Sequence, residues 1–493
     1  MKNSLLKGAF WLLLLALCWP HAATAQERGQ GALKSLLERP TEDKGDDITI
    51  DEPDSCIEQP LGDGCRVVRI DAVIIEGLGR TQRYVVMREL LFEEGDYASM
   101  SQIQESITRL LNLGLFREVD WQLISKKAEL VDGQPPEQNP KRPARVLKIR
   151  VDERWTLLPF FTLVQGGGLT QFATGGSDIN LFGRYLTAGV QYDRLGLNET
   201  FLQPGGAANS FVVWFQDPRF LNSRTSAGID LWRITRLRSI YEPDGTLEGG
   251  FSLERRIAIL RFQREFKRWL YGGLNFEWID DGFSYDFIPE ATREIQQDNF
   301  GGLPSGGRAI TARGNMRFGR VNRDDFYYDG WSLTQWFGHT DKLWGSDFRF
   351  SQLESILVAY KKIPFRGNLA ARVRLGFTNT EQIQYLYYMG GLNRVRGYRD
   401  SQFRGNSYWA VNAEYRVAPI ASRWFALQMV GFVDSGATAD SLNPFIELDA
   451  ASVGGGVRII SPKIYGFVAR FDYAYPIING AGGALSFGAQ QFF

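Results

Sequence analysis

The sequence has few of the side chains that most often build metal and catalytic sites. It contains only three cysteines and two histidines in 493 residues. Zinc sites draw mainly on Cys and His, and a hydrolytic triad needs a His base. His21 lies within a predicted export signal, which leaves His339 as the one histidine of the mature chain. We therefore expect no enzyme activity, no catalytic residues, no metal and no cofactor.

The chain also has no net charge, and it has no long apolar run beyond the N-terminus. Lys and Arg together number 56, as do Asp and Glu, so no overall basicity points to nucleic acid as a partner. No later stretch resembles a transmembrane helix, which needs about 20 apolar residues. The chain can still cross a membrane as a β-barrel, whose single strands give weak sequence signals.

The N-terminus is predicted to direct export. Residues 10–19 are apolar, and Ala23-Thr24-Ala25 offers a small-residue cleavage site before Gln26. A membrane-anchoring helix is the alternative, but the apolar run is too short for one. We expect a signal peptide over residues 1–25, cleaved near Ala25, followed by a polar linker over residues 26–65.

That linker ends in a predicted disulfide loop. Cys18 leaves with the signal, so Cys56 and Cys65 remain, separated by a segment that contains Pro60 and two glycines. Two thiols at this spacing favour a disulfide in an oxidising compartment. Metal binding is the weaker alternative because histidine is scarce.

Residues 66–154 are predicted to form a small α+β domain. Apolar and polar residues alternate over 67–76, as in a half-buried strand. Helical periodicity follows over 81–92, where Thr81 is a plausible N-cap, and again over 99–114. Two further strands are expected over 116–125 and 144–154, which gives the order β-α-α-β-β.

From residue 155 onward the pattern becomes that of strands. Residues 407–417 and 466–477 alternate strictly, with Glu414, Arg416, Arg470 and Asp472 on the polar faces. A soluble sandwich and a membrane barrel share this period. The uninterrupted strand region, the aromatic apolar faces and the terminal Phe493 favour a transmembrane barrel over 155–493 with about 16 antiparallel strands. The longest connection is expected to carry a short helix over 289–297.

Several motifs then show a resemblance. The chain contains "VRGY" at 395–398, "GFVDSG" at 431–436 and "DPRF" at 217–220. With the preceding α+β domain, these resemble the outer-membrane assembly-factor superfamily of BamA-, TamA- and FhaC-like proteins, over residues 66–493. The resemblance implies a polypeptide-transport-associated (POTRA) domain in the periplasm and a surface-antigen-type barrel in the bacterial outer membrane. A single POTRA domain departs from the several or two that these relatives carry.

The resemblance also implies that the loop containing Val395, Arg396, Gly397 and Tyr398 folds into the barrel lumen. Alternation over 425–434 places Phe432 and Asp434 on the inner face, in the strand motif that ends at Gly436. We predict a lumen latch in which Arg396 pairs with Asp434, with Glu414 nearby.

Within the same loop, Gly397 would allow the tight turn and Tyr398 would pack at the tip. Arg394, Arg399 and Arg404 have no assigned partner, and we expect them to face solvent or lipopolysaccharide.

The function that the resemblance implies is protein insertion or translocation. An unfolded outer-membrane or secreted polypeptide would add as a strand to the edge formed by residues 116–125. The polypeptide would then move through the barrel lumen, or through the seam between residues 157–168 and 483–493. Gly166, Gly167 and Gly168 would weaken strand pairing there, and Gly488 and Phe493 fit the C-terminal assembly signal, although Gln491 departs from it.

Other readings remain open at this point. The chain could be a dedicated two-partner-type secretion transporter, or a passive outer-membrane pore or structural barrel. Outer-membrane lipid, lipopolysaccharide and periplasmic accessory proteins are the other expected partners.

Overall fold

The structure is a computed structural model, and a large part of the chain is described in it. The described residues are 55–62, 64–125, 144–166, 169–197, 201–203, 206–242, 244–324, 327–391, 394–422, 424–441, 447–461, 468–480 and 482–489. The predicted signal peptide, most of the linker, Gly167, Gly168 and Phe493 lie outside these residues.

The N-terminal α+β domain is a four-stranded sheet in the order β2-β1-β4-β3. Its elements are β1 (Val67–Glu76), α4 (Arg83–Met87), β2 (Tyr97–Ser99), α5 (Met100–Asn112), β3 (Phe116–Ser125) and β4 (Ala144–Glu153). The predicted disulfide between Cys56 and Cys65 is formed, and it closes a loop that begins in α3 (Ser55–Glu58). The carbonyl oxygen of Cys56 accepts a hydrogen bond from Ser99 Oγ at 2.7 Å, which fixes this loop to the start of α5.

Two local predictions for this domain need correction. The first helix is only five residues long, and its N-cap is Gln82 rather than Thr81. The Thr81 hydroxyl instead accepts a hydrogen bond from the Asn180 side chain, and the Thr81 N–H donates to Glu153. The hydroxyl is therefore engaged in a tertiary contact and does not cap the helix. The short strand β2 was also missed, because three residues carry no periodic signal.

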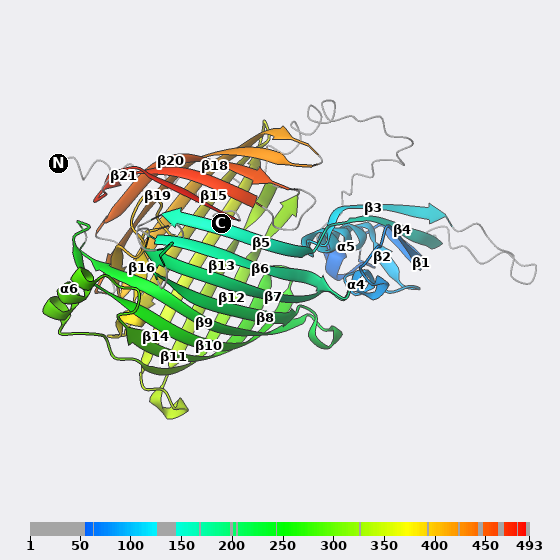
Figure 1. The fold of residues 1–493 in the computed structure, drawn as a ribbon. Helices are drawn as coiled ribbons and strands as arrows, with labels where there is room; N and C mark the ends of the chain where they lie inside the picture. Colours follow the sequence, from blue (N-terminus) through cyan, green and yellow to red (C-terminus); the bar gives the residue numbers. More distant parts are fainter. Residues whose placement is uncertain are drawn as a thin grey trace, which may run out of the picture. The chain divides into compact units, whose positions relative to one another are not determined.

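The rest of the described chain forms one 16-stranded antiparallel sheet, coloured cyan to red in Figure 1. Its first eight strands are β5 (Leu157–Gly166), β6 (Leu169–Leu181), β7 (Leu186–Leu197), β8 (Ala207–Asp217), β9 (Thr225–Tyr241), β10 (Leu247–Lys267), β11 (Leu270–Ser284) and β12 (Gly307–Asp324). The other eight are β13 (Tyr327–Thr340), β14 (Phe350–Ile363), β15 (Gly367–Thr378), β18 (Ser407–Ala421), β19 (Ala426–Ala439), β20 (Ala450–Ile460), β21 (Val468–Ile478) and β22 (Ala484–Ala489). The predicted strand number is therefore correct.

The two faces of this sheet are opposite in polarity to those of a soluble protein. On β19, Met429 and Val433 are 53% and 48% exposed, whereas their respective chain neighbours Gln428 and Asp434 are fully buried. Polar side chains thus fill the interior and apolar ones cover the outside, which suits lipid rather than water. Among the described helices, none is long and apolar enough to cross a bilayer.

The first and last strands of the sheet lie side by side. Neighbouring strands pair from β5 round to β22, and the described residues of β22 then lie beside β5 without forming a ladder with it. The described part of the last strand has six residues. Within the described residues, the two ends of the sheet therefore meet at a seam that has fewer backbone hydrogen bonds than the other strand boundaries.

Among the described residues, four connections of the barrel carry secondary structure of their own. The loop between β15 and β18 contains the hairpin of β16 (Tyr387–Met389) and β17 (Phe403–Gly405). The predicted helix in the longest connection is α6 (Glu290–Phe300), and short 3-10 turns cover Phe220–Asn222, Lys342–Trp344 and Ile383–Tyr385.

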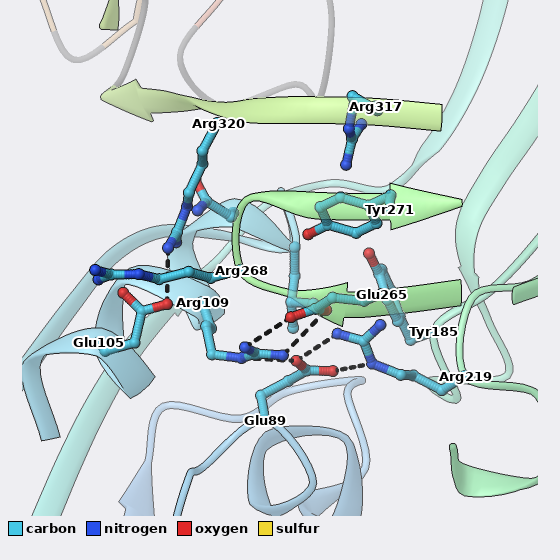
Figure 2. A pocket seen from close by; sticks show the side chains of 12 residues that line it. Glu89, Glu105, Arg109, Tyr185, Arg219, Glu265, Arg268, Tyr271, Arg317 and Arg320 are labelled. Atoms are coloured by element: carbon cyan, nitrogen blue, oxygen red, sulfur yellow. Dashed lines mark hydrogen bonds and ion pairs between the residues drawn. The ribbon is translucent and has the colours of Figure 1, made fainter. Parts of the chain in front are cut away.

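Ion pairs join the α+β domain to the barrel. Arg219, in the turn between β8 and β9, donates two hydrogen bonds of 2.6 Å to the carboxylate of Glu89. Arg109 on α5 pairs in the same bidentate way with Glu265 on β10, at 3.0 and 3.2 Å (Figure 2). Bidentate Arg–carboxylate contacts fix orientation as well as distance.

Candidate functional site

Glycines shape the loop between β16 and β17 so that it enters the barrel. Gly390, Gly391 and Gly397 have φ angles of 112°, 70° and 93°, in the region that only glycine adopts readily. A Cβ on Gly397 would also stand 3.3 Å from the Cβ of Ala474 on β21. The turn at Gly397 therefore lies against the inner wall, and Arg396 precedes it.

Arg396 makes contacts with carboxylates on three barrel strands. Its Nε and Nη2 donate to the two oxygens of Asp434 on β19, at 2.7 and 2.9 Å. Its Nη1 donates to Glu414 on β18 at 2.7 Å and to Asp472 on β21 at 3.3 Å. All four side chains are almost completely buried. The structure thus brings together the three residues of the predicted latch and adds Asp472 to them.

Further arginines complete this network on neighbouring strands. Arg416 donates to the second oxygen of Glu414 at 2.7 Å. Arg458 on β20 holds the carboxylate of Asp472 with both terminal nitrogens. Sequence reasoning placed Asp472 and Arg470 on the polar face of their strand, and it did not assign them to the site. Their inward alternation was the available signal, but the register between strands was not readable from it.

An aromatic ring and a glycine make room for the guanidinium group. The centre of the Arg396 guanidinium lies 3.5 Å from the ring centroid of Phe432, which is a cation–π contact. The ring in turn covers Gly454 on β20, where a Cβ would stand 2.3 Å from Phe432 Cζ. Gly454 is therefore a position that the packing of the site requires to be small.

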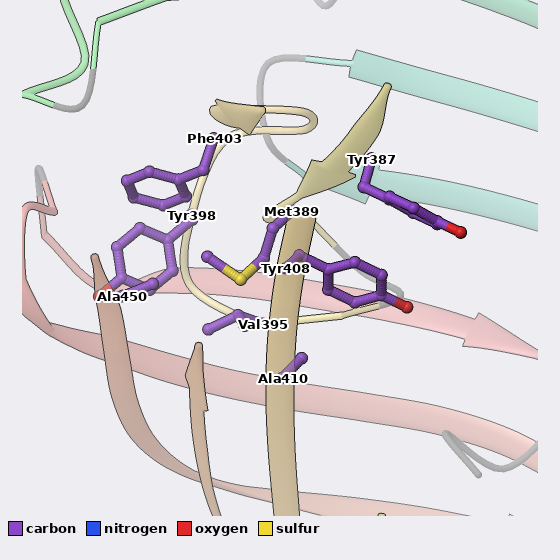
Figure 3. Packing of buried hydrophobic residues seen from close by; sticks show 8 residues of the cluster. All are labelled: Tyr387, Met389, Val395, Tyr398, Phe403, Tyr408, Ala410 and Ala450. Carbon is purple, nitrogen blue, oxygen red and sulfur yellow. The ribbon is translucent and has the colours of Figure 1, made fainter. Parts of the chain in front are cut away.

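Apolar packing holds the rest of the loop. Val395, Tyr398, Met389 and Phe403 are buried in one cluster with residues from β18 and β20 (Figure 3). The Tyr398 hydroxyl donates to the Ile478 carbonyl at 2.5 Å and accepts from the Ala451 N–H at 2.8 Å, so it also bridges two strands.

Gly436 in the strand motif leaves space for Met389 of the same cluster. A Cβ there would meet the sulfur of Met389 at 2.5 Å. Gly397 and Gly436 thus both allow the loop to approach the wall closely.

The other arginines of the loop have partners, contrary to expectation. Arg394 stacks on the ring of Tyr408 at 4.3 Å, and Arg399 stacks on Tyr241 at 5.1 Å. Arg404 pairs with Glu248 on β10 at 3.1 Å. Their expected orientation toward solvent or lipopolysaccharide is wrong for Arg394 and Arg404, since the loop folds inward and its basic residues meet the wall.

Two strand edges are placed where a polypeptide could pair. β3 is an edge strand of the α+β domain, paired only with β4. At the barrel seam, Gly166 ends β5 and Gly488 lies in β22. In the described residues, no group of three or more His, Cys, Asp or Glu side chains is arranged to hold a metal ion.

The comparisons with known proteins agree with this architecture. Residues 180–493 match the model of the Omp85 superfamily domain, and residues 68–154 match a POTRA model described as a surface antigen variable number repeat. The chain belongs to the Omp85 superfamily. Omp85 members are outer-membrane barrels with periplasmic POTRA domains, and this chain is accordingly an outer-membrane protein.

Curated relatives of this Omp85 chain carry the name outer membrane protein assembly factor BamA. The one from Nitratidesulfovibrio vulgaris is 26% identical over 451 residues, which cover 86% of this chain and 51% of the relative. The one from Neorickettsia risticii is 29% identical over 171 residues, covering 34% of this chain and 20% of the relative. The chain therefore spans about half or less of the length of these relatives, and neither name denotes an enzyme.

Solved structures show the same fold at low identity. BamA from Haemophilus ducreyi lacking POTRA domains 1–3 aligns with a TM-score of 0.51 and 16% identity, covering 86% of this chain and 85% of that one. CdiB from Acinetobacter baumannii aligns with a TM-score of 0.58 and 13% identity, covering 86% and 74%. These similarities support the Omp85 fold.

Proposed function

We propose that this Omp85 protein assists the insertion or translocation of polypeptides into or across the bacterial outer membrane. The observation that carries the proposal is the barrel seam. Among the described residues, every other pair of neighbouring strands forms a ladder, whereas β22 lies beside β5 without one. Unpaired strand edges are templates for another chain, so the seam offers backbone groups to a client strand.

The POTRA domain would receive the client in the periplasm. In the part of the chain that the structure describes, edge strand β3 pairs on one side only, and Ile124 on it is 43% exposed. Strand addition at such an edge takes its affinity from main-chain hydrogen bonds, and it therefore tolerates many client sequences. Periplasmic accessory proteins are a second class of partner for this domain.

The outer face supports a lipid environment for the barrel. Phe266 and Trp269, near the turn between β10 and β11, are 56% and 48% exposed. Aromatic side chains at strand ends are typical of the membrane interface. Outer-membrane lipid and lipopolysaccharide are the surroundings that this surface suits.

The lumen loop bears on the two alternative functions. Arg396 and its buried network hold the loop inside the barrel, which argues against a permanently open passive pore. Dedicated secretion of one exoprotein remains the second candidate, since it uses the same domains.

Depletion of the protein followed by quantitative outer-membrane proteomics tests the proposal. Loss of many barrel proteins would support insertion, and loss of one exoprotein would support dedicated secretion. An unchanged proteome would overturn both and favour the passive barrel. Complementation with the wild-type chain serves as the control for indirect effects of depletion.

A further inference from the structure

A charged cavity of about 240 Å³ lies where the POTRA domain meets the barrel. It is lined by five arginines and three glutamates, with two tyrosines and other residues beside them. The lining therefore has two more guanidinium groups than carboxylates. Such a surplus in a concave site attracts anions.

The three glutamates of the cavity are already engaged. Their ion pairs are Glu89 with Arg219 at 2.6 Å, Glu265 with Arg109 at 3.0 Å, and Glu105 with Arg320 at 2.7 Å (Figure 2). Each of these carboxylates is therefore already bound to an arginine of the cavity.

Arg317 on β12 is the arginine whose surroundings point to a ligand. It lies directly opposite Tyr271 in the β11–β12 ladder, and its guanidinium lies 3.9 Å from the centroid of that ring. Its Nε is buried and has no hydrogen-bond partner among the described residues. The neighbouring Met316 is 47% exposed on the outer face, so Arg317 points inward.

We propose that this cavity binds the carboxylate of an extended polypeptide, with Arg317 as the residue that recognises it. A guanidinium is planar, and it can donate two parallel N–H hydrogen bonds to the two oxygens of a carboxylate. The Tyr271 ring below Arg317 holds the guanidinium in place. The inference rests on the proposed function, because a client passing from the POTRA domain to the barrel would meet this cavity.

The carboxylate has two sources in a polypeptide, the chain terminus and an acidic side chain. Binding of fluorescent ten-residue peptides to the purified full chain in detergent separates them. One peptide has a free C-terminus and no acidic side chain, the second is the same peptide amidated, and the third is amidated with one internal Glu. Fluorescence anisotropy gives the dissociation constants.

We expect at least one carboxylate peptide to bind about tenfold or more tightly than the amidated one, as befits a charge-assisted hydrogen bond. Arg317→Gln should remove this preference, and Arg317→Lys should restore part of it. The matched control is Arg349→Gln, which removes an exposed charge far along the chain from the cavity residues and should leave the preference intact.

Equal binding of all three peptides would overturn the inference, as would a preference that survives in Arg317→Gln. Displacement of the peptide by inorganic phosphate at equal affinity would also overturn it, with phosphate as the ligand instead. If Arg317→Gln fails to fold, a photoreactive group beside the peptide carboxylate must crosslink to cavity residues of the wild-type chain.

This experiment is independent of the depletion test. Carboxylate preference with an unchanged outer-membrane proteome would refute the proposed function and leave the binding site standing. Loss of barrel proteins on depletion without any carboxylate preference would refute only the site.

Discussion

Arg396 is the residue on which the conformation of the lumen loop depends most. It is 1% exposed and bonds to Asp434, Glu414 and Asp472 on three different strands. A buried ion pair is weak evidence of net stability, because desolvation offsets the attraction. Removal of one partner is costly, however, because it leaves the others charged and buried.

The substitution Arg396→Ala should therefore destabilise the barrel by about 3–5 kcal/mol. Denaturant unfolding in detergent measures this loss, and protease digestion of the loop should become faster. Arg349→Ala, at an arginine that is 72% exposed, should change stability little. A variant that folds, resists protease and functions as wild type would show that the predicted latch has no structural role.

The close contact between Gly454 and the Phe432 ring gives a second prediction for a single residue. Gly454→Ala would place a Cβ 2.3 Å from the Phe432 ring and 2.2 Å from the Tyr473 carbonyl oxygen, so we expect a loss of about 1–3 kcal/mol. Gly431→Ala is the matched control, since nothing lies within 4 Å of a Cβ there. Equal stability of the two variants in denaturant unfolding would contradict the tight packing of this site.

At the scale of elements, exposed strand edges carry the proposed client contacts. β3 is an edge strand, whereas β1 lies inside the sheet. Beside Ile74 the other edge of β1 is covered by side chains, because Glu94 and Arg83 bond to the backbone N–H and carbonyl of Val73. Each strand has an exposed isoleucine, Ile124 on β3 and Ile74 on β1, 43% and 47% exposed. Lysine on an edge strand discourages strand addition.

We accordingly expect Ile124→Lys to lower client crosslinking to the POTRA domain and Ile74→Lys to leave it near the wild-type level. Both changes are at exposed positions, so stability should shift by no more than about 0.5 kcal/mol. Site-specific crosslinking in cells, compared with thermal unfolding of the purified variants, measures both effects. If the two variants reduce crosslinking equally, then the edge of β3 is not the receiving strand.

At the scale of the whole molecule, ion pairs hold the POTRA domain to the barrel. Arg219 belongs to the "DPRF" motif that the sequence analysis singled out, and it pairs with Glu89, which is 1% exposed. Burial by itself lowers the pKa of Arg219, but the hydrogen bonds and charge of Glu89 raise it above its ordinary value. Arg219 thus remains charged at physiological pH.

Arg219→Gln should loosen this junction, because it leaves Glu89 charged, buried and without its strongest partner. Limited proteolysis should then cut faster between the two domains. The double variant Glu89→Gln with Arg219→Gln should be less sensitive than the single one, since no charge is stranded. If protease cuts the double variant faster than the single one, then the attraction between Arg219 and Glu89 exceeds the free-energy cost of burying their charges.

The fold class, the number of strands and the faces of the strand residues were all predictable from the sequence. The number of strands follows from the length of the strand region. The faces follow from the alternation of apolar and polar residues, because each strand residue points to the face opposite to that of its neighbours. This alternation therefore placed Glu414 and Asp434 on the inner wall.

Only the tertiary structure decided which inward residues meet. Register between strands and the path of the loop bring Asp472 and Arg458 to Arg396, and they turn Arg394 and Arg404 toward the wall. The contact of Arg219 with Glu89 joins residues 130 positions apart. No local pattern encodes such contacts, because they arise from packing between distant segments.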